Sequence, residues 1–366
     1  MEPADRKGGA GGRAEAVEGR EPTRLDRRTF LRTAGTALVT SSLAGLAGCS
    51  GGRETQPTLS IGYKPKFAAL QYLVMSETGT LSELDAAVEP TNFAGTDASI
   101  VSAFADGDLD VGFFGVTQTL KMIEKGVPAT GVAANHKNGF VLVGEPTFAD
   151  QFESEGADAF RQRSEERGEP VQFTTGPAGG MGNLVTTYWL FEELGLSRDV
   201  IDIQTMAGIK AIRRSLLSGN AAGTALDEPT LTRLATEDAA VEYLAEPESF
   251  LPELPGGIMV VRDELLAERP ALARDVTRAH VQATELINDQ PAEAAAAASA
   301  AIGDSLSTAT ARQAIDSAAS TYVSDPREIE AGTGVFADYM RSEGLLDSDV
   351  GFATAFDLEV YDAVSN

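Results

Sequence analysis

From Thr58 onward, short apolar runs that end in a turn alternate with segments in which apolar residues recur at helical spacing. In the first such segment, Phe67, Leu70, Leu73 and Val74 fall on one helical face, which Gly79 can terminate. Strands that alternate with helices are typical of βαβ units and of a parallel sheet covered by helices. In this part of the chain we expect strands at 58–63, 87–93, 110–115 and 129–135, and further helices starting at Asp97 and Thr117.

The same alternation returns after a charged segment at 148–169, which we interpret as a solvated helix at the outer edge of a second unit. Here we expect strands at 171–176, 200–206, 221–227 and 241–245, and helices at 183–194, 209–217 and 230–236. After residue 261 the pattern is helical to the end, including the alanine-rich stretch 291–302. The two groups of strands predict two similar α/β lobes.

The chain is strongly acidic, with 29 Lys and Arg against 55 Asp and Glu. A charge excess of this size destabilises a compact state at low ionic strength, a property that halophilic proteins exploit, and the 7 lysines leave a surface suited to concentrated salt. Nucleic acid is excluded as a partner because no basic stripe is available to displace its counterions.

The first 48 residues follow the plan of an export signal, with basic residues before an uncharged run at 33–47. That run is shorter than the roughly twenty apolar residues of a membrane-spanning helix. Arg27-Arg28 with Phe30-Leu31 resembles the twin-arginine motif, and LAGC at 46–49 resembles a lipobox, which implies cleavage before Cys49 and a lipid on its sulfur. The alternative is that Cys49 is an ordinary buried thiol.

Cleavage there would leave 318 residues, beginning with a flexible tether at 49–57. This length exceeds the size at which single cores usually stop growing, which again favours two lobes. With one cysteine in the whole chain, no disulfide is expected. We therefore predict an extracytoplasmic protein anchored by lipid to the outer face of the cell membrane.

Polar residues gather at the predicted carboxyl ends of the strands, where open α/β sheets bind their ligands. The glycine-rich stretch GPAGGMG at 176–182 follows a strand and opens a helix, so its backbone N–H groups could face an anion. It fits neither the Walker loop nor the dinucleotide fingerprint, and alone it is also compatible with a tight turn. Four of the six lysines after residue 48 fall at these loops, namely Lys64, Lys66, Lys137 and Lys210. This placement favours a cleft for a small anion. The alternative is that these lysines are scattered at random over the surface.

Several short motifs in order resemble the solute-binding proteins of ABC importers for sulfonates, nitrate, taurine or bicarbonate. They are IGY at 61–63, FAG at 93–95, ADGDLDVG at 105–112, GVT at 115–117, GPAG at 176–179 and EP at 228–229. The resemblance covers residues 58–262 and implies the two-lobed periplasmic-binding-protein fold (type II), each lobe a mostly parallel sheet flanked by helices. It implies lobe 1 at 58–143 and 257–366, lobe 2 at 144–256, a ligand cleft between them, and hinge strands near 139–144 and 255–261.

The resemblance also implies where a ligand would be held. The candidate contacts are Tyr63, Lys64, Gly95, Gly115, Val116, Thr117, Asn138, Gly179, Gly180, Met181, Gly182, Asp227 and Glu228, to which the lysine pattern adds Lys210. Asp227 and Glu228 are open to a second interpretation, because acidic residues before Pro229 would equally cap the following helix.

We therefore expect a lipid-anchored receptor that closes on a small anion and delivers it to an ABC permease with its ATPase. Neither a cofactor nor a metal is expected. An enzyme is the rival class, including the pyrimidine synthases of similar fold. However, His136 and His280 are the only histidines, and no metal-binding or nucleophile motif appears. A neutral or cationic solute, such as a thiamin pyrimidine, is the other alternative, with acidic residues in place of the lysines.

Overall fold

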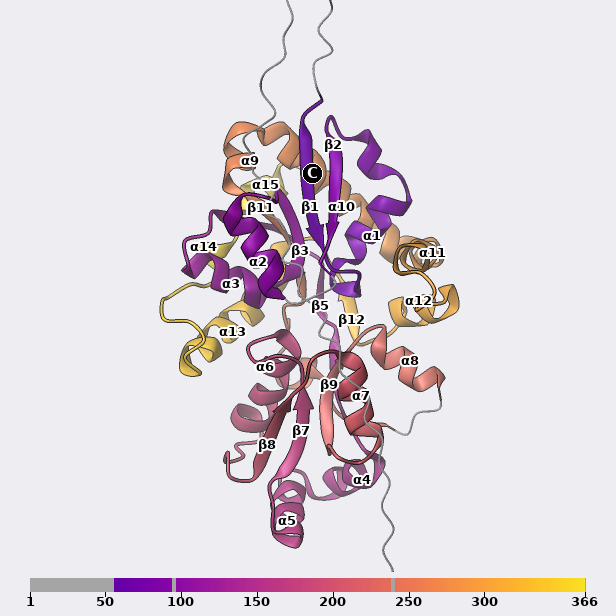
Figure 1. The fold of residues 1–366 in the computed structure, drawn as a ribbon, viewed down its shortest axis with the longest axis vertical. Coiled ribbons are helices and arrows are strands. Elements are labelled where there is room, and N and C mark those ends of the chain that lie inside the picture. Colours follow the sequence, from indigo (N-terminus) through magenta and orange to yellow (C-terminus); the bar gives the residue numbers. More distant parts are fainter. Residues whose placement is uncertain (1–55, 94–96, 238–240, 366) are drawn as a thin grey trace, which may run out of the picture. The chain divides into compact units, whose positions relative to one another are not determined.

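The computed structural model describes residues 56–93, 97–237 and 241–365, and its first sheet has five strands in the order β2-β1-β3-β11-β4 (Figure 1). β1 pairs in parallel with β2 and β3, whereas β11 is antiparallel to β3 and β4. The bounds are β1 Thr58–Tyr63, β2 Ala87–Asn92, β3 Val111–Gly115, β4 Ala129–Ala134 and β11 Gly257–Arg262.

The second sheet has the order β10-β6-β9-β7-β8. β7 is parallel to β8 and β9, and β6 is antiparallel to β9 and β10. The bounds are β6 Phe140–Gly144, β7 Val171–Thr175, β8 Ile201–Thr205, β9 Gly223–Asp227 and β10 Glu242–Ala245. In each sheet a single strand, β11 in the first and β6 in the second, runs against the other four, so both sheets are mostly parallel, as expected.

Helices follow most strands, as the alternating pattern predicts. Beside the first sheet are α1 Leu70–Glu77, α2 Asp97–Asp106 and α3 Val116–Glu124. The middle of the chain contributes α4 Pro146–Glu155, α5 Asp158–Arg167, α6 Met181–Tyr188, α7 Ile209–Leu217 and α8 Thr230–Thr236. The last part contributes α9 Asp263–Glu268, α10 Pro270–Asp289, α11 Pro291–Ile302, α12 Thr308–Ile315, α13 Glu330–Ser342, α14 Phe352–Ala355 and α15 Leu358–Asp362.

The predicted α/β class with two helix-flanked sheets is thus confirmed, and one boundary needs correction. Residues 140–143, which the sequence assigned to the first lobe, pair with β9 and β10 in the second sheet. An apolar run of five residues carries no mark of the sheet it will join, so the error is one of long-range pairing rather than of local pattern.

The core beside the first sheet shows why its helices form where they do. The predicted face of Phe67, Leu70, Leu73 and Val74 is buried throughout, and it packs with side chains of α10, α11 and α12. All six residues of β11 are buried, as is usual for a strand covered by helices on both faces.

The charged segment at 148–169 differs from its prediction, because it forms two helices, α4 and α5, that are separated at Gly156. Their inner faces bury Phe148 and Phe160 against Phe173 and Trp189, with ring centroids between 4.8 and 6.2 Å apart. The charged residues therefore lie on the outer face of this layer. Three phenylalanines of the segment, Phe148, Phe152 and Phe160, lie on its core side.

The chain passes between the two sheets through β5 (His136–Asn138), which pairs with β12 (Ser320–Tyr322) and lies between the sheets (Figure 1). Asn138 and Gly139 both have left-handed backbone, with φ of 63° and 90°, a conformation that asparagine and glycine tolerate best. The returning segment is equally tight, since a Cβ added to Gly257 would lie 2.1 Å from the carbonyl oxygen of Ala68.

None of the helices within residues 56–93, 97–237 and 241–365 combines the length and hydropathy that a membrane span requires. The predicted signal peptide, Cys49 and most of the predicted tether lie outside the described residues.

Candidate ligand-binding site

The carboxyl ends of β1 and β3 lie at one edge of the first sheet, because the two strands are parallel neighbours with Tyr63 opposite Phe113. The Tyr63 ring packs on Tyr72 of α1, with 4.2 Å between centroids. Lys64 follows, and its burial, with a smaller contribution from the charge of Lys66, lowers its pKa to about 8. A lysine of this kind gains from any anion that approaches it.

The end of β3 leads directly into α3, whose N-cap is Gly115 and has no side-chain cap. The N–H of Val116 donates to the carbonyl of Gly256 over 3.3 Å. Thr117 is fully buried, and its hydroxyl donates to Oε1 of Gln118 over 2.9 Å. Because a helix starts here with N–H groups that lack intrahelical partners, the positive end of its dipole is available.

The glycine-rich loop at 176–182 plays the same part for the second sheet, because it joins β7 to the start of α6. Asn183 holds the loop in place: its Oδ1 accepts from the N–H of Gly179 over 2.9 Å, and its Nδ2 donates to Thr175 Oγ1 over 3.0 Å. Gly179 has φ of 72°, so glycine is needed there. The N-cap of α6, Gly180, also lacks a side-chain cap.

The two helix starts meet. A Cβ added to Gly115 would lie 3.3 Å from Cγ of Met181. Lys121, one turn after Thr117 on α3, donates from Nζ to the carbonyl of Gly179 over 3.4 Å, and burial lowers its pKa. We call this region, residues 115–121 and 179–183, the α3–α6 junction. It joins residues from the ends of β3 and β7, which belong to different sheets.

Several predicted contacts lie elsewhere or are used locally. Glu228 is 3 % exposed, and its carboxylate accepts from the N–H and the hydroxyl of Thr232, both over 3.1 Å, while burial raises its pKa. Asp227 accepts from the Thr230 hydroxyl over 3.4 Å. These contacts match the second interpretation of this pair, in which it caps the start of α8.

Lys210 lies in the exposed first turn of α7, and among the described residues no hydrogen bond or ion pair joins it to the junction. Lys137 is in β5 rather than in a strand-to-helix loop, and its Nζ pairs with Glu328 over 3.0 Å. Asn138 is buried at the crossing, and its Oδ1 lacks a partner within the described part of the chain. Gly95 falls in the gap at 94–96 and so outside the described residues.

Sequence reasoning missed Lys121, Gln118 and Asn183. Lys121 lies inside a helix, whereas the lysine pattern covers only the predicted strand-to-helix loops. The available signal was the four-residue spacing, which places Lys121 on the face of Thr117 and Asn183 within reach of Gly179. Within the described ranges, no group of three His, Cys, Asp or Glu side chains is arranged to hold a metal ion.

Solved structures with the same fold are numerous. The ligand-binding component of an ABC-type import system from Staphylococcus aureus, solved with zinc bound, has a TM-score of 0.68 at 16% identity, covering 85% of this chain and 99% of that one. The periplasmic aliphatic sulphonate-binding protein of Escherichia coli has a TM-score of 0.66 at 14% identity, with coverage of 82% and 92%. The periplasmic nitrate-binding protein of Synechocystis PCC 6803 has 0.67 at 11% identity, with coverage of 85% and 89%.

These structures define the class of fold as that of periplasmic binding proteins. The model of the NMT1-like family matches residues 52–302, so this chain belongs to the NMT1-like family. The resemblance to sulfonate and nitrate receptors is thereby confirmed for family and fold. No curated protein is similar enough in sequence to count as a relative.

Proposed function

We propose that this protein is the extracytoplasmic solute-binding component of an ABC importer and that it captures a small anion at the α3–α6 junction. The observation that carries the proposal is the meeting of two helix N-termini from different sheets, neither of which has a side-chain cap. Each N-terminus is equivalent to roughly half a positive charge, so bringing two together without an anion between them is unfavourable. An oxyanion would offset that repulsion and accept hydrogen bonds from the N–H groups at the helix starts.

The side chains around the junction support the same choice of ligand. Lys121 reaches the glycine-rich loop, and Lys64 lies at the end of the strand next to the one that leads into α3. Both lysines have a pKa lowered first of all by burial, so each would be stabilised in its charged form by an anion. In a chain of net charge −26, placing two partly buried cations near one site favours an anionic ligand.

Capture would proceed by closure about the crossing segments. β5 and the segment before β11 connect the sheets, and the left-handed pair Asn138-Gly139 stands where β5 leads into β6. Closure of two units around a ligand is an established mode of domain motion. The contact between Lys121 and Gly179 would then belong to the closed state.

The protein would be held at the outer face of the membrane by a lipid on Cys49, after export through a twin-arginine signal, and would pass its solute to a permease driven by a cytoplasmic ATPase. It would catalyse no reaction itself. The structural neighbours named for ABC-type import, sulphonate and nitrate support this assignment by fold.

A thermal-shift panel in concentrated KCl tests the proposal. The probes are methanesulfonate, taurine, nitrate, bicarbonate and phosphate, with a thiamin pyrimidine and riboflavin as the neutral or cationic arm. A ligand at about 100 times its Kd should add about 2.7 kcal/mol of stability. A shift with an anion, lost in Lys121→Gln and kept in Lys125→Gln, is the expected result. Lys125 is the control because it caps the far end of the same helix and is exposed.

Two other results would contradict the proposal. A shift with only the pyrimidine or the flavin would overturn the anion assignment and leave the receptor. No shift with any probe, together with no change of radius of gyration when a cell-extract solute pool is added, would overturn the receptor.

A further inference from the structure

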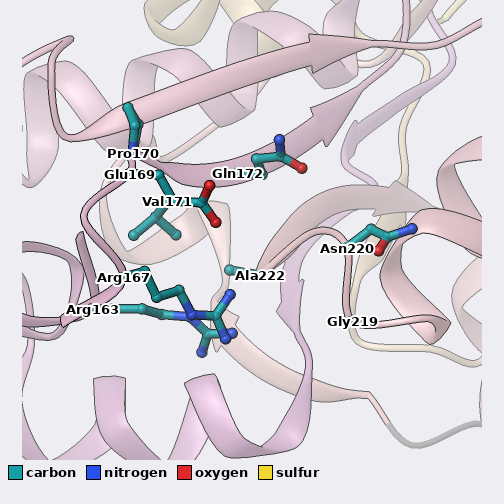
Figure 2. Close-up of a pocket in the computed structure, with 9 residues that line it drawn as sticks. All are labelled: Arg163, Arg167, Glu169, Pro170, Val171, Gln172, Gly219, Asn220 and Ala222. Atoms are coloured by element: carbon teal, nitrogen blue, oxygen red, sulfur yellow. The ribbon is translucent and has the colours of Figure 1, made fainter. Parts of the chain in front are cut away.

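A cavity of about 180 Å³ lies at the opposite end of the second sheet from the α3–α6 junction (Figure 2). Its walls include Val171, which opens β7, and Ala222, which precedes β9. The junction begins beyond the last residue of β7, Thr175, so the five residues of this strand separate the two places by roughly 15 Å. The proposed cleft therefore does not include this cavity, which we call the arginine pocket.

One wall of the arginine pocket carries a guanidinium that is fixed in place. Arg163 of α5 is only 7% exposed. Its Nη2 pairs with Glu145 Oε1 over 2.7 Å, and its guanidinium carbon lies 5.0 Å from the centroid of the Phe148 ring. One carboxylate oxygen engages only part of the five N–H donors of an arginine. The group is thus held by an acid and an aromatic face, with donor capacity left for a further partner.

A second guanidinium comes from the same helix face. Arg167 is four residues after Arg163, so the two side chains are neighbours on α5, and both line the pocket. Arg167 is exposed, and within the described part of the chain it makes no ion pair. Two like charges at this spacing disfavour the helix slightly unless a negative group lies between them.

The other walls supply neutral and acidic polar groups. Gln172 and Asn220 present side-chain amides, and Glu169 presents a carboxylate (Figure 2). Amides can donate to a ligand oxygen, whereas the carboxylate of Glu169 can only accept. A ligand with a single negative charge and at least one O–H group fits this set better than a multiply charged anion, because an O–H can donate to Glu169.

We infer that the arginine pocket is a second binding site, for a small singly charged oxyanion such as dihydrogen phosphate or a hydroxycarboxylate. Arg163 and Arg167 hold the charged oxygens, the pairing that planar guanidinium groups favour, and Glu169 accepts from the hydroxyl. The cavity has room for about six waters at about 30 Å³ each, so an ion of this size enters with part of its hydration. Binding here occurs independently of the solute at the junction.

The test titrates inorganic phosphate, and glycolate in a second series, into the full-length protein at constant ionic strength, followed by calorimetry and by amide chemical shifts. The expected result is saturable binding with shifts confined to residues near 163–172 and 219–222. Arg167→Gln should weaken binding at least about tenfold, because it removes one charged hydrogen-bonding partner. The matched control is Arg161→Gln, since Arg161 is an exposed arginine of the same helix that pairs with Asp158 outside the pocket.

Three outcomes would overturn the inference: no saturable binding of either probe, equal losses in Arg167→Gln and Arg161→Gln, or shifts that centre on residues 115–121 and 179–183. Because Arg167 is exposed, its replacement should leave the fold intact, and the thermal melt without phosphate checks this. An acetate series shows whether the hydroxyl matters; tighter binding of acetate than of glycolate would contradict the role given to Glu169.

Discussion

The two ends of β7 provide positive charge in different ways. At its carboxyl end, the α3–α6 junction relies on helix N-termini, glycines and the partly buried Lys121, with Lys64 at the end of β1, the strand next to β3. At its amino end, the arginine pocket relies on two guanidinium groups on a helix whose C-cap, Gly168, follows Arg167 directly. A helix C-terminus carries the negative end of the dipole, so side chains must supply the positive charge there.

The two proposed anion sites thus differ in kind, one built mainly from backbone and the other from side chains, and they should respond differently to mutation, pH and salt. Backbone dipoles in a buried junction cannot be titrated. Lys64, with a pKa of about 8, loses its charge as pH rises through that value, while arginines stay charged throughout.

The largest expected effect comes from Gly179→Ala, which tests the backbone contribution. The left-handed conformation costs an alanine about 1–2 kcal/mol in stability. The new Cβ would also lie 2.3 Å from Nζ of Lys121 and would displace it. We expect anion affinity at the junction to fall about tenfold to a hundredfold, the equivalent of one charged hydrogen bond. Calorimetry with whichever anion shifts the melt measures it.

Gly176→Ala is the matched control in the same loop, because a Cβ there meets nothing within 4 Å and its φ is not positive. Phosphate binding at the arginine pocket should be unchanged in both variants. Equal losses in Gly176→Ala and Gly179→Ala would mean that the loop merely tolerates no substitution, and the backbone argument would fail.

A smaller effect is expected from pH, and it should act on the α3–α6 junction rather than on the arginines of the arginine pocket. The pKa of Lys64 is about 8, so its charge is present below that value and is lost as pH rises through it. Anion affinity at the junction should therefore fall as pH rises from about 8 to about 10, by up to about tenfold in all. Lys64→Gln should bind more weakly at neutral pH and lose the fall in affinity that begins near pH 8. A wild-type profile that is already flat from pH 7 to 10 would remove Lys64 from the site.

Salt should act mainly on the arginine pocket, with an effect of up to about tenfold. Raising KCl from about 0.1 M to 1 M shortens the screening length from about 10 Å to 3 Å. Phosphate binding beside the exposed Arg167 should weaken about tenfold, and anion binding at the partly buried junction less than about threefold. Titrations at the two salt concentrations measure both. If salt weakened anion binding at the junction more than phosphate binding at the arginine pocket, the distinction between backbone and side-chain sites would fail.

The smallest effect concerns stability in the absence of ligand. Arg167→Gln removes a like-charge neighbour of Arg163, but it also removes a cation that complements the dipole in the last turn of α5. The two contributions oppose each other, so the free energy of unfolding should change by less than about 0.5 kcal/mol. Urea denaturation at low salt can resolve this. The variant should also lose the stabilisation that phosphate gives to the wild type. A loss of more than about 1 kcal/mol, beyond what the helix dipole supplies, would show that Arg167 already has a partner in the folded chain.

Much of the fold could be predicted because the relevant signals are local. The face formed by Phe67, Leu70, Leu73 and Val74, and the closing glycines such as Gly107 and Gly195, lie within a few residues of the helices that they define. The pairing of β6 with β9 could not be predicted, because residues 140–144 and 223–227 are joined only by long-range contacts. The split of the charged segment into α4 and α5 was not predicted, because the interpretation rested on the charged residues and gave no weight to Phe148 and Phe160.

The candidate site shows the same limit. Its backbone elements, Gly115 and the loop at 176–182, follow from the rule that ligands lie at strand ends. The role of Lys121 could not be predicted from that rule, because its approach to Gly179 depends on how α3 and α6 face each other across two sheets. The arginine pocket could not be anticipated either, since the sequence gives no sign that α5 and the end of α7 share a cavity.

The single tryptophan of the chain, Trp189, is 2% exposed and surrounded by Phe152, Phe160 and Phe173. Its indole is therefore a built-in optical probe, with blue-shifted emission and shielding from aqueous quenchers. It follows α6 directly, whereas Phe160 belongs to the helix of the arginine pocket. Its fluorescence would thus report on the interior between the two regions. Emission that does not change during a titration would therefore not mean that no ligand binds.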